Sequence, residues 1–315
     1  MSTVRPALSI VATLYRSEAT LAEFCDRARA AAEAVVGGDY ELVLVNDGSP
    51  DGSLDLAVSL HQRDPHVRVV DLSRNFGHHK AMMTGLEYAR GALVFLIDCD
   101  LEEDPALLGS FYAKLRETGA DAVYGVQTAR KGGWFERCSG YVFFRLFNLL
   151  STHKLPVNVV TVRLMTRRFV ESMIRHRERA VVMAALAAIT GYRQEAMPIV
   201  KRSKGHSTYT LRRKIAIFVE SITSFSDRPL VAIFYIGSVI VVTASLAALR
   251  LIYRKFAHGI SVVGWPSLIV SIWLLGGLTI FCVGLLGIYL SKVFIETKQR
   301  PYTIVRAVHE REILD

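Results

Sequence analysis

The chain has 315 residues and a formal net charge of +9, from 38 Lys and Arg against 29 Asp and Glu. This length suits one large domain with an appended segment. The four cysteines show no CxxC or metal-ligand spacing, which excludes a zinc site and favours reduced thiols in a cytosolic domain. No cleavable signal peptide is visible, because the first apolar run, LSIVATLY, is too short and lacks a cleavage site.

Strand and helix patterns alternate from the N-terminus to about residue 127. The predicted strands are Leu8–Thr13, Tyr40–Asn46, VRVVDL (67–72) and ALVFLI (92–97), and the predicted helices are Thr20–Val36, Ser53–Gln62, KAMMTGLEYA (80–89) and ALLGSFYAKL (106–115). Runs of Val, Ile and Leu that alternate with helices predict an α/β fold with a mostly parallel sheet covered on both faces. In such sheets, ligands bind beyond the carboxyl ends of the strands.

A cluster of carboxylates follows the fourth strand, in the stretch FLIDCDLEEDP (95–105). Alternate residues of an extended segment point the same way, so Asp98 and Asp100 can reach one site. Two oxygen ligands with open positions suit Mg²⁺ or Mn²⁺, which keep water and bind phosphates. Acids also favour a helix N-terminus, and this accounts for Glu103 and Asp104 better than for the first two. We expect a cation at Asp98 and Asp100 that bridges to a diphosphate.

Two further loops follow strands at the same edge of the predicted sheet. Asp47 ends the second strand in VLVNDGSPDGS, where it can accept hydrogen bonds from a base or ribose, with Ser49 as a second nucleotide contact. The same residues are also good turn chemistry. LSRNFGHHK opens a helix near Lys80, where backbone N–H groups can meet a phosphate. The adjacent His78 and His79 are interpreted as loop or phosphate contacts rather than as a zinc pair.

Two nucleotide-binding motifs are absent from the sequence. No GxGxxG follows the first strand, so a dinucleotide dehydrogenase is not supported. GxxxxGK[ST] is missing as well, which excludes a P-loop NTPase. We expect no nucleic-acid partner.

Two charge-free segments near the C-terminus predict two membrane-spanning helices, at 229–249 and 259–291, separated by the short basic loop RLIYRKFAH. The Lys and Arg bias of the flanking segments places the N-terminal domain and the C-terminal tail in the cytosol. We therefore expect a multi-pass protein of the plasma membrane. Small residues on the second span favour packing against other copies, and hence a homo-oligomer: Gly276, Gly277, Gly284 and Gly287.

Two amphipathic segments precede the spans. Residues 134–151 suit either a membrane-interface helix or a core-facing one. Residues 211–225 stand directly before the first span and would dock the domain onto the bilayer. The expected division is a catalytic domain at 1–210, a juxtamembrane helix at 211–228, two spans at 229–291 and a cytosolic tail at 292–315.

The ordered motifs resemble those of the family 2 glycosyltransferases with the GT-A fold. The resemblance runs from VNDGSPDGS through DLSRNFGHHKAMMTGLEYARG and FLIDCDLEEDP to GHSTYTLRRK and the two spans. This full-length pattern is similar to the polyprenyl-phosphate glycosyltransferases. It implies inverting transfer of a hexose, by default glucose, from a UDP-sugar to polyprenyl (undecaprenyl) phosphate at the cytoplasmic face. It also implies that Asp47 contacts the nucleotide, while Asp98 and Asp100 serve the metal and diphosphate.

The chain departs from the family pattern at two places. Relatives usually carry Gln where this chain has Glu102, so the acidic cluster, which we expect to be catalytic, is stronger here. Relatives commonly read P-x-D-x-G-D-F-R-L where this chain reads PVNVVTVRL. Asn158 and Thr161 therefore replace two aspartates, the second of which is a proposed base in the family, in a loop that we expect over Asn158–Val162.

The loss of that base is compatible with transfer to a phosphate. A phosphate monoester has a second pKa near ~6 and is mostly a dianion at neutral pH, so it needs positive charge rather than a base. Arg163, Lys201 and Arg202 are the expected acceptor-phosphate residues.

Rival functions have weaker support in the sequence. A processive synthase would carry QxxRW, but Gln194 is followed by EAMP. A nucleotidyltransferase could share the metal site, but its reaction does not require the two predicted membrane spans. A catalytically silent nucleotide-binding membrane partner stays open because of Asn158 and Thr161. The sugar also stays open, with an N-acetylhexosamine as the alternative to a hexose.

Overall fold

The computed structural model describes residues 5–127, 158–177, 183–201, 228–258 and 264–311. These residues fall into two units, one formed by the described parts of 5–201 together with 300–311, and the other by 228–299. The predicted helix at 134–151, the juxtamembrane helix and Arg202 lie outside the described residues.

The first unit alternates strands and helices, as the sequence predicts. Its strands are β1 (Leu8–Leu14), β2 (Tyr40–Asn46), β3 (Val67–Leu72), β4 (Leu93–Leu96), β5 (Ala122–Gln127), β6 (Val159–Thr166), β7 (Gln194–Ile199) and β8 (Val305–His309). Its helices are α1 (Glu18–Val36), α2 (Ser53–Arg63), α3 (His78–Tyr88), α4 (Leu107–Thr118), α6 (Arg167–Ile174) and α7 (Met183–Thr190).

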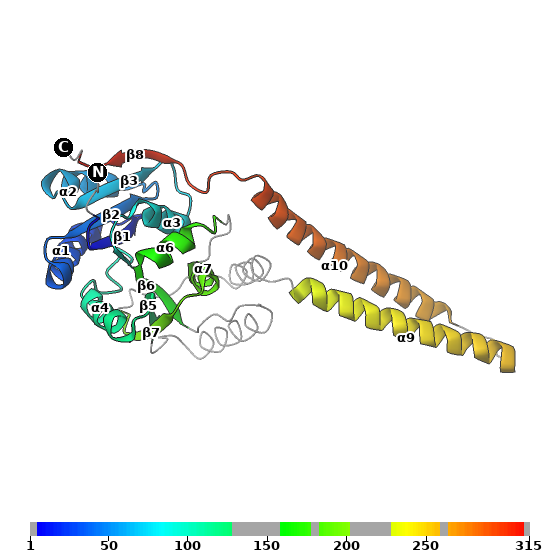
Figure 1. Cartoon of the computed structure of the whole chain (residues 1–315). Coiled ribbons are helices and arrows are strands. Elements are labelled where there is room, and N and C mark those ends of the chain that lie inside the picture. The colour runs from blue at the N-terminus through cyan, green and yellow to red at the C-terminus, as the bar shows by residue number, and fades with distance from the viewer. Residues whose placement is uncertain (1–4, 128–157, 178–182, 202–227, 259–263, 312–315) are drawn as a thin grey trace. The chain divides into compact units, whose positions relative to one another are not determined.

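The described strands form one sheet in the order β7-β5-β6-β4-β1-β2-β3-β8 (Figure 1). The pairs β1–β2, β1–β4, β2–β3 and β5–β7 are parallel. β6 runs antiparallel to both β4 and β5, and β8 runs antiparallel to β3. The expected mixed α/β, Rossmann-like sheet is confirmed.

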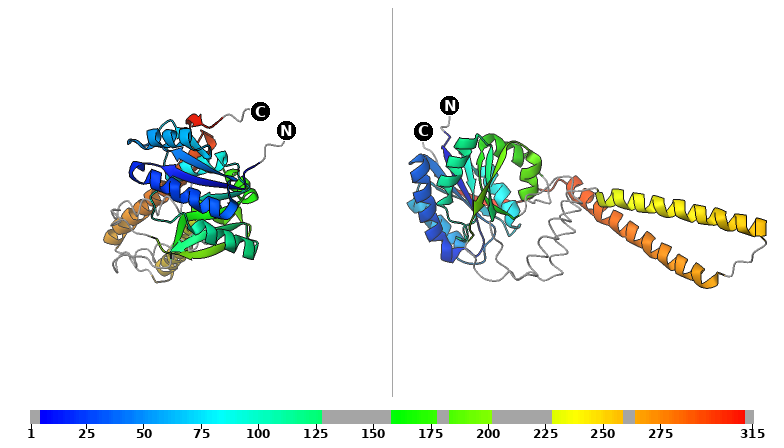
Figure 2. Two further views of the ribbon diagram at one scale, coloured as in Figure 1. Left: turned by 90° about the vertical axis from the view of Figure 1, so that its left-hand side faces the viewer. Right: turned by 90° about the horizontal axis from the view of Figure 1, so that it is seen from below.

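Helices cover both faces of the sheet (Figure 2). Side chains of α1, α2 and α4 pack on one face, where Phe24 and Phe111 are fully buried. Side chains of α3, α6 and α7 pack on the other face, where Met82 and Phe169 are buried. Since both faces are covered, strands β1 to β3 are buried along their whole length, which is why they read as continuous apolar runs.

The segment expected to be a loop over Asn158–Val162 is mostly strand. β6 begins at Val159, and Arg163 and Met165 pair with Leu96 and Val94 of β4. The loop prediction is wrong because VVTV is rich in β-branched residues, which suit a strand packed between two others. Asn158 itself has a φ of 62°, so the turn is confined to the residue before the strand.

The C-terminal strand β8 completes the sheet at its β3 edge. Val69, Val70 and Asp71 pair with β8, with an irregularity between Asp71 and Leu72. Beyond the strand, the carboxylate of Glu310 contacts Arg68 at 2.8 Å and Arg90 at 2.8 Å. The sequence predicts a cytosolic tail here. The pairing of β8 with β3 is a long-range contact that the local sequence of the tail does not indicate.

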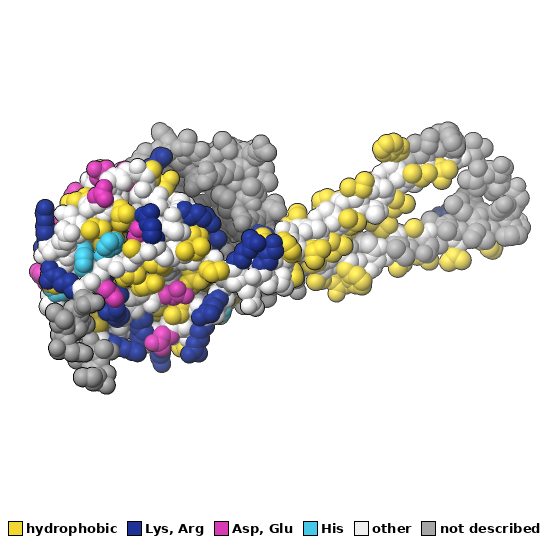
Figure 3. Space-filling model, turned by 90° about the horizontal axis from the view of Figure 1, so that it is seen from above, with side chains coloured by type: hydrophobic (Ala, Val, Ile, Leu, Met, Phe, Trp, Pro, Cys, Tyr) yellow, Lys and Arg dark blue, Asp and Glu magenta, His cyan; other side chains and the backbone are white. Residues whose placement is uncertain are grey.

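The second unit contains two long helices, α9 (Arg228–His258) and α10 (Trp265–Thr297). Among the described residues, one segment is long and apolar enough to cross a membrane, Ser271–Thr297, with a mean hydropathy of 2.1 and no burial. The first part of α9, Arg228–Ala244, is a shorter apolar stretch. Hydrophobic side chains lie along the visible surface of both helices (Figure 3).

Candidate active site

Polar side chains gather where the parallel strands β1, β2, β3 and β4 end. Asp47 directly follows β2, and Asp98 follows β4 by two residues. The loop between β3 and α3 contacts Asp47 through Phe76, and the first residue of α3, His78, contacts Asp98. Polar groups therefore lie at the edge of the sheet where the sequence predicts ligand binding.

Asp47 joins the turn after β2 to the loop after β3. Its two carboxylate oxygens accept the backbone N–H of Phe76 at 2.7 Å and of Gly77 at 3.0 Å. Burial raises the pKa of Asp47, and these two N–H groups act against that rise. At 2% exposure, the carboxylate is primarily a brace between two loops.

Gly48 allows the turn after β2 to lie close to the backbone of the loop after β3. It has a φ of 60°, and a Cβ atom there would lie 2.4 Å from the backbone nitrogen of Asn75. Only glycine combines this backbone conformation with this clearance at no steric cost.

The turn itself is held by short hydrogen bonds. Ser49 Oγ donates to Asp51 at 2.5 Å and accepts the backbone N–H of Arg16 at 2.7 Å. Burial acts to raise the pKa of Asp51, but the bonds from Ser49 and Ser53 outweigh it and lower the pKa to about 2. Ser49 thus anchors the end of β1 to the turn that follows β2.

Asp98 is the anion at the end of a row of polar side chains. Thr13 Oγ1 lies 3.0 Å from His78 Nδ1, and His78 Nε2 lies 3.2 Å from Asp98 Oδ1. Burial acts to raise the pKa of Asp98, but the bond and charge of His78 and a bond from Thr161 lower it overall. For His78, burial acts to lower the pKa, and Asp98 raises it overall.

The rest of the acidic loop pairs with cationic side chains, and Arg27 contacts Asp104 at 3.3 Å. Lys201 Nζ lies 2.9 Å from Glu102 and 3.7 Å from Glu103. Asp100 is exposed, with its Oδ1 accepting the N–H of Glu102 at 2.9 Å. Burial, followed by the charge of Asp98, raises the pKa of Glu103 to about 7. Lys201, which the sequence predicts as an acceptor-phosphate residue, therefore lies among the acids.

Asp98 and Asp100 fit a divalent cation. Asp98 Oδ1 is buried and, among the described residues, receives no well-directed hydrogen bond. Asp100 reaches outward from the same loop. The described residues hold no group of three His, Cys, Asp or Glu side chains arranged as a closed metal site. Two carboxylates with open positions suit Mg²⁺ or Mn²⁺, which complete their coordination with water and phosphate oxygens.

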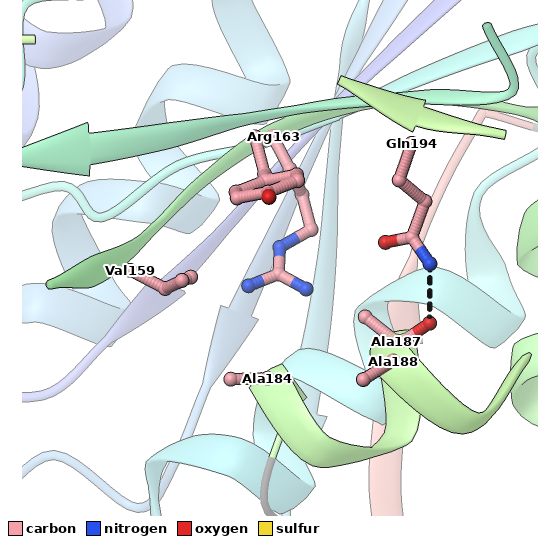
Figure 4. A pocket seen from close by; sticks show the side chains of 7 residues that line it. Val159, Arg163, Ala184, Ala187, Ala188 and Gln194 are labelled. Atoms are coloured by element: carbon pink, nitrogen blue, oxygen red, sulfur yellow. Dashed lines mark hydrogen bonds between the residues drawn. The ribbon is translucent and has the colours of Figure 1, made fainter. Parts of the chain in front are cut away.

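Arg163 occupies a cavity on the α7 side of the sheet. The cavity has a volume of about 210 Å³, and most of its lining is apolar: Tyr124, Val159, Arg163, Ala184, Ala187, Ala188 and Gln194. The guanidinium extends toward the alanines of α7 (Figure 4). Burial lowers the pKa of Arg163 to about 10, while the charges of Glu103 and Asp98 act to raise it. The cavity thus combines a buried cation with an apolar wall.

Sequence comparisons place this site in a known family. A profile described as glycosyl transferase family 2 matches residues 9–175. A Mycobacterium tuberculosis (strain CDC 1551 / Oshkosh) protein named among glycosyltransferases is 54% identical over 306 residues, covering 97% of this chain and 89% of the relative. The chain belongs to glycosyl transferase family 2.

Other relatives carry more specific names. A prophage bactoprenol glucosyl transferase homolog from Escherichia coli (strain K12) is 32% identical to this glycosyltransferase, covering 96% of this chain and 99% of the relative. Among solved structures, mannosyl-3-phosphoglycerate synthase from Rubrobacter xylanophilus is 18% identical and covers 69% of this chain and 72% of that one, with a TM-score of 0.48.

The structure brings together some, but not all, of the residues predicted for the glycosyltransferase. Asp98, Asp100 and Glu102 share one loop with Lys201 beside them. Asp47 and Ser49 share the neighbouring turn. Lys80 lies in the first turn of α3, which begins at His78. Arg163 lines the cavity beside α7, where the charges of Glu103 and Asp98 still act on it.

Sequence reasoning missed three contributors to the site of the glycosyltransferase. The sequence predicts His78 as a loop or phosphate contact, and the structure adds that it faces Asp98. Thr13, the last residue but one of β1, lies within hydrogen-bond distance of that histidine. Glu103 was assigned to a helix N-terminus, but it is fully buried. The adjacent acids of the DCDLEED stretch are the signal in the sequence that points to this part of the site.

Proposed function

We propose that this glycosyltransferase transfers a hexose, by default glucose, from a UDP-sugar to polyprenyl phosphate, with inversion, at the cytoplasmic face of a membrane. The observation that carries the proposal is that one domain holds both an acidic site suited to a divalent cation and a buried guanidinium in a mostly apolar cavity. The name of the bactoprenol glucosyl transferase relatives supports the same acceptor class.

The donor is assigned to the edge formed by β2, β3 and β4. Asp47 and Ser49 order the turn expected to contact the nucleotide, and Lys80 lies where a phosphate would meet α3. When bound by Asp98 and Asp100, a Mg²⁺ or Mn²⁺ ion supplies positive charge that favours departure of the diphosphate. His78 and Thr161 hold the Asp98 side chain in the ionised form that such binding needs.

The acceptor phosphate is assigned to Arg163. Its Nε and one terminal nitrogen donate to the carbonyls of Thr161 and Val160, which fixes the plane of the guanidinium. The alanine-rich wall of α7 opposite suits the first isoprene carbons of a lipid phosphate. Arg202, which lies outside the described residues, and Lys201 complete the predicted set.

The chemistry needs no proton acceptor. An oxygen of the phosphate dianion forms a bond to the anomeric carbon, while the bond from that carbon to the UDP diphosphate breaks. The acceptor thereby loses one negative charge and the departing UDP gains one, so charge balances without proton transfer. Thr161, which replaces a family aspartate, acts with His78 to lower the pKa of Asp98.

The C-terminal strand supports an even number of membrane crossings. β8 belongs to the same sheet as the strands that precede α9, so the chain leaves this domain and returns to it. If Ser271–Thr297 crosses the bilayer, a second segment must cross as well, and the apolar part of α9 is the candidate. This reasoning supports a multi-pass plasma-membrane protein with the catalytic domain and C-terminus in the cytosol. A homo-oligomer remains a prediction.

Full-length protein with UDP-[¹⁴C]glucose, Mn²⁺ and undecaprenyl phosphate tests the proposal. The Asp98→Asn variant should lose at least about 100-fold in formation of labelled lipid, because its side chain no longer carries charge for the cation. Asp26→Asn, at a carboxylate with 75% exposure, is the matched control and should keep full turnover. Unchanged turnover in Asp98→Asn would refute the site assignment. No turnover by the wild-type protein with any UDP-sugar would favour the silent partner, and turnover only with a UDP-N-acetylhexosamine would change the sugar.

The acceptor assignment has its own test. Arg163→Gln should raise the KM for undecaprenyl phosphate and leave the affinity for UDP within about twofold of wild type, since the donor groups lie on other strands. Retained UDP affinity also shows that the variant is folded. Equal KM values for the lipid in the variant and the wild type would remove Arg163 from the acceptor site.

A further inference from the structure

A single buried carboxylate connects the C-terminal strand to the nucleotide turn. Asp71, near the end of β3, is 2% exposed. Its Oδ2 accepts a hydrogen bond from Arg306 Nε of β8 at 2.6 Å. Its Oδ1 accepts a hydrogen bond from Asn46 Nδ2 at 2.8 Å, at the end of β2. One side chain of the last strand and one of the second strand thus meet at the same carboxylate.

Asn46 links Asp71 to the turn after β2. Its side-chain oxygen accepts the backbone N–H of Ser49 at 3.2 Å, and the residue is 1% exposed. An amide has donors on one end and an acceptor on the other, so donation to Asp71 fixes which end faces Ser49. Arg306 therefore influences the turn that carries Asp47 through two intervening side chains.

The same C-terminal segment also contacts α3. Thr303 Oγ1 lies 2.8 Å from Thr84 Oγ1, on the helix whose first residue is His78. Just before this helix, the carbonyl of Ile304 accepts the backbone N–H of Ser73 at 2.9 Å. The segment that follows α10 in sequence thus supports both sides of the predicted nucleotide site.

We propose that Arg306 is a positioning residue for the nucleoside-diphosphate site, acting through Asp71 and Asn46 on the turn that carries Asp47. An exposed ion pair contributes little to stability, but here one partner is buried. Without Arg306, the Asp71 carboxylate keeps the Asn46 amide as its partner in this chain of contacts. β8 also loses a side-chain hydrogen bond to β3. The nucleotide part of this inference rests on the proposed function, whereas the ordering of the turn does not.

Hydrogen exchange tests the ordering directly. Full-length Arg306→Ala protein in detergent, without nucleotide, should exchange the amides of residues 46–53 at least about fivefold faster than wild type. Arg311→Ala is the matched control, since it removes the same charge from the same terminal segment and Arg311 donates to the carbonyl of Gln62, outside the turn. Arg306→Lys should restore slow exchange in part. Exchange in α7, which packs against α6 and β6, reports whether the whole domain has loosened.

Nucleotide affinity tests the consequence. In calorimetry with UDP and Mn²⁺, Arg306→Ala should bind UDP about tenfold more weakly, the loss expected for a charge-assisted hydrogen bond in such a chain. In turnover, the KM for the UDP-sugar should rise while kcat stays within about twofold, because the acidic loop is untouched. Asp71→Asn, which keeps the shape but loses the ion pair, should behave in the same way.

The outcomes separate this inference from the proposed function. Faster exchange at 46–53 with weaker UDP binding supports the inference, and equal exchange in Arg306→Ala and Arg311→Ala overturns it. Uniformly faster exchange across the domain also overturns it, because the role of Arg306 is then only structural. Absence of UDP binding by wild-type protein removes the proposed donor, while the exchange result still decides whether Arg306 orders the turn.

Discussion

Glu103 offers a quantitative test of the electrostatics of the acidic loop. Its side chain is fully buried, and neither oxygen has a hydrogen-bond partner among the described residues. Burial and the charge of Asp98 raise its pKa from 4.5 to about 7. A pKa difference of about 2.5 units corresponds to about 3 kcal/mol, at about 1.36 kcal/mol per unit. This is the free energy of unfolding that the wild-type protein forfeits when the carboxyl is ionised.

The sign of the pH dependence follows from the raised pKa. The folded state holds the Glu103 proton more tightly than the unfolded chain does, so the stability gained from that proton is complete below about pH 4.5. It is lost as the pH rises through about 7. Glu103→Gln removes this titration while it keeps the shape of the side chain. The variant should therefore match wild type near pH 4.5 and exceed it by about 3 kcal/mol above pH 8.

Thermal unfolding in detergent and EDTA measures this difference. At pH 8 the melting temperature of Glu103→Gln should exceed that of wild type by roughly 6–12 °C, for a domain of this size. Glu117→Gln, at an exposed position of α4, is the control and should show the same small change at both pH values. A Glu103→Gln effect that is equal at pH 5 and pH 8 would refute the reasoning, as would a variant less stable than wild type at pH 8.

Three further predictions concern the turn after β2, the acidic loop and the opposite end of the sheet. Gly48→Ala should abolish measurable UDP binding, because its Cβ would lie 2.4 Å from the backbone nitrogen of Asn75, whereas Gly109→Ala has open space at its Cβ and should bind UDP normally. Burial raises the pKa of the Cys99 thiol to about 12, so at pH 8 iodoacetamide should label this residue only after unfolding in urea, as measured by mass spectrometry. Arg68→Met should lower the free energy of unfolding by about 3–5 kcal/mol in denaturant titrations, because it leaves a buried carboxylate 2.7 Å away without its cation.

Each of these has a contrary result. Wild-type UDP affinity in Gly48→Ala would show that the turn can move without loss of the site. Rapid labelling of Cys99 in folded protein would show that the acidic loop opens readily. A loss below about 1 kcal/mol in Arg68→Met would show that the ion pair contributes no more than a surface pair.

The parallel half of the sheet could be predicted because its strands carry their own signal. β2 spans Tyr40–Asn46 as expected, and β1 and β4 differ from prediction by one or two residues at their ends. These strands are buried on both faces, so nearly every residue is apolar and the run itself marks the strand. Strand ends in turn place Asp47 and Asp98, which is why that part of the candidate site could be predicted.

The antiparallel strands could not be predicted in the same way. β6 pairs with β4 and β5, and β8 pairs with β3 across more than two hundred residues of chain. Their positions depend on long-range register, which a local pattern does not contain. The role of Asp47 as a brace depends on the backbone N–H groups of a distant loop, and backbone donors leave no mark in the sequence. The sequence shows His78 in a loop, but its contact with Asp98 depends on how the loops after β3 and β4 pack together.

Release of UDP by purified wild-type protein tests the central claim most directly. The protein is incubated with Mn²⁺ or Mg²⁺ and a panel of UDP-sugars, with and without undecaprenyl phosphate. The account predicts release from a UDP-hexose, UDP-glucose by default, that requires both the cation and the lipid phosphate, and that disappears in Asp98→Asn. Folded protein that releases no UDP from any sugar in the presence of lipid phosphate, or releases it equally well without the lipid, would contradict the account.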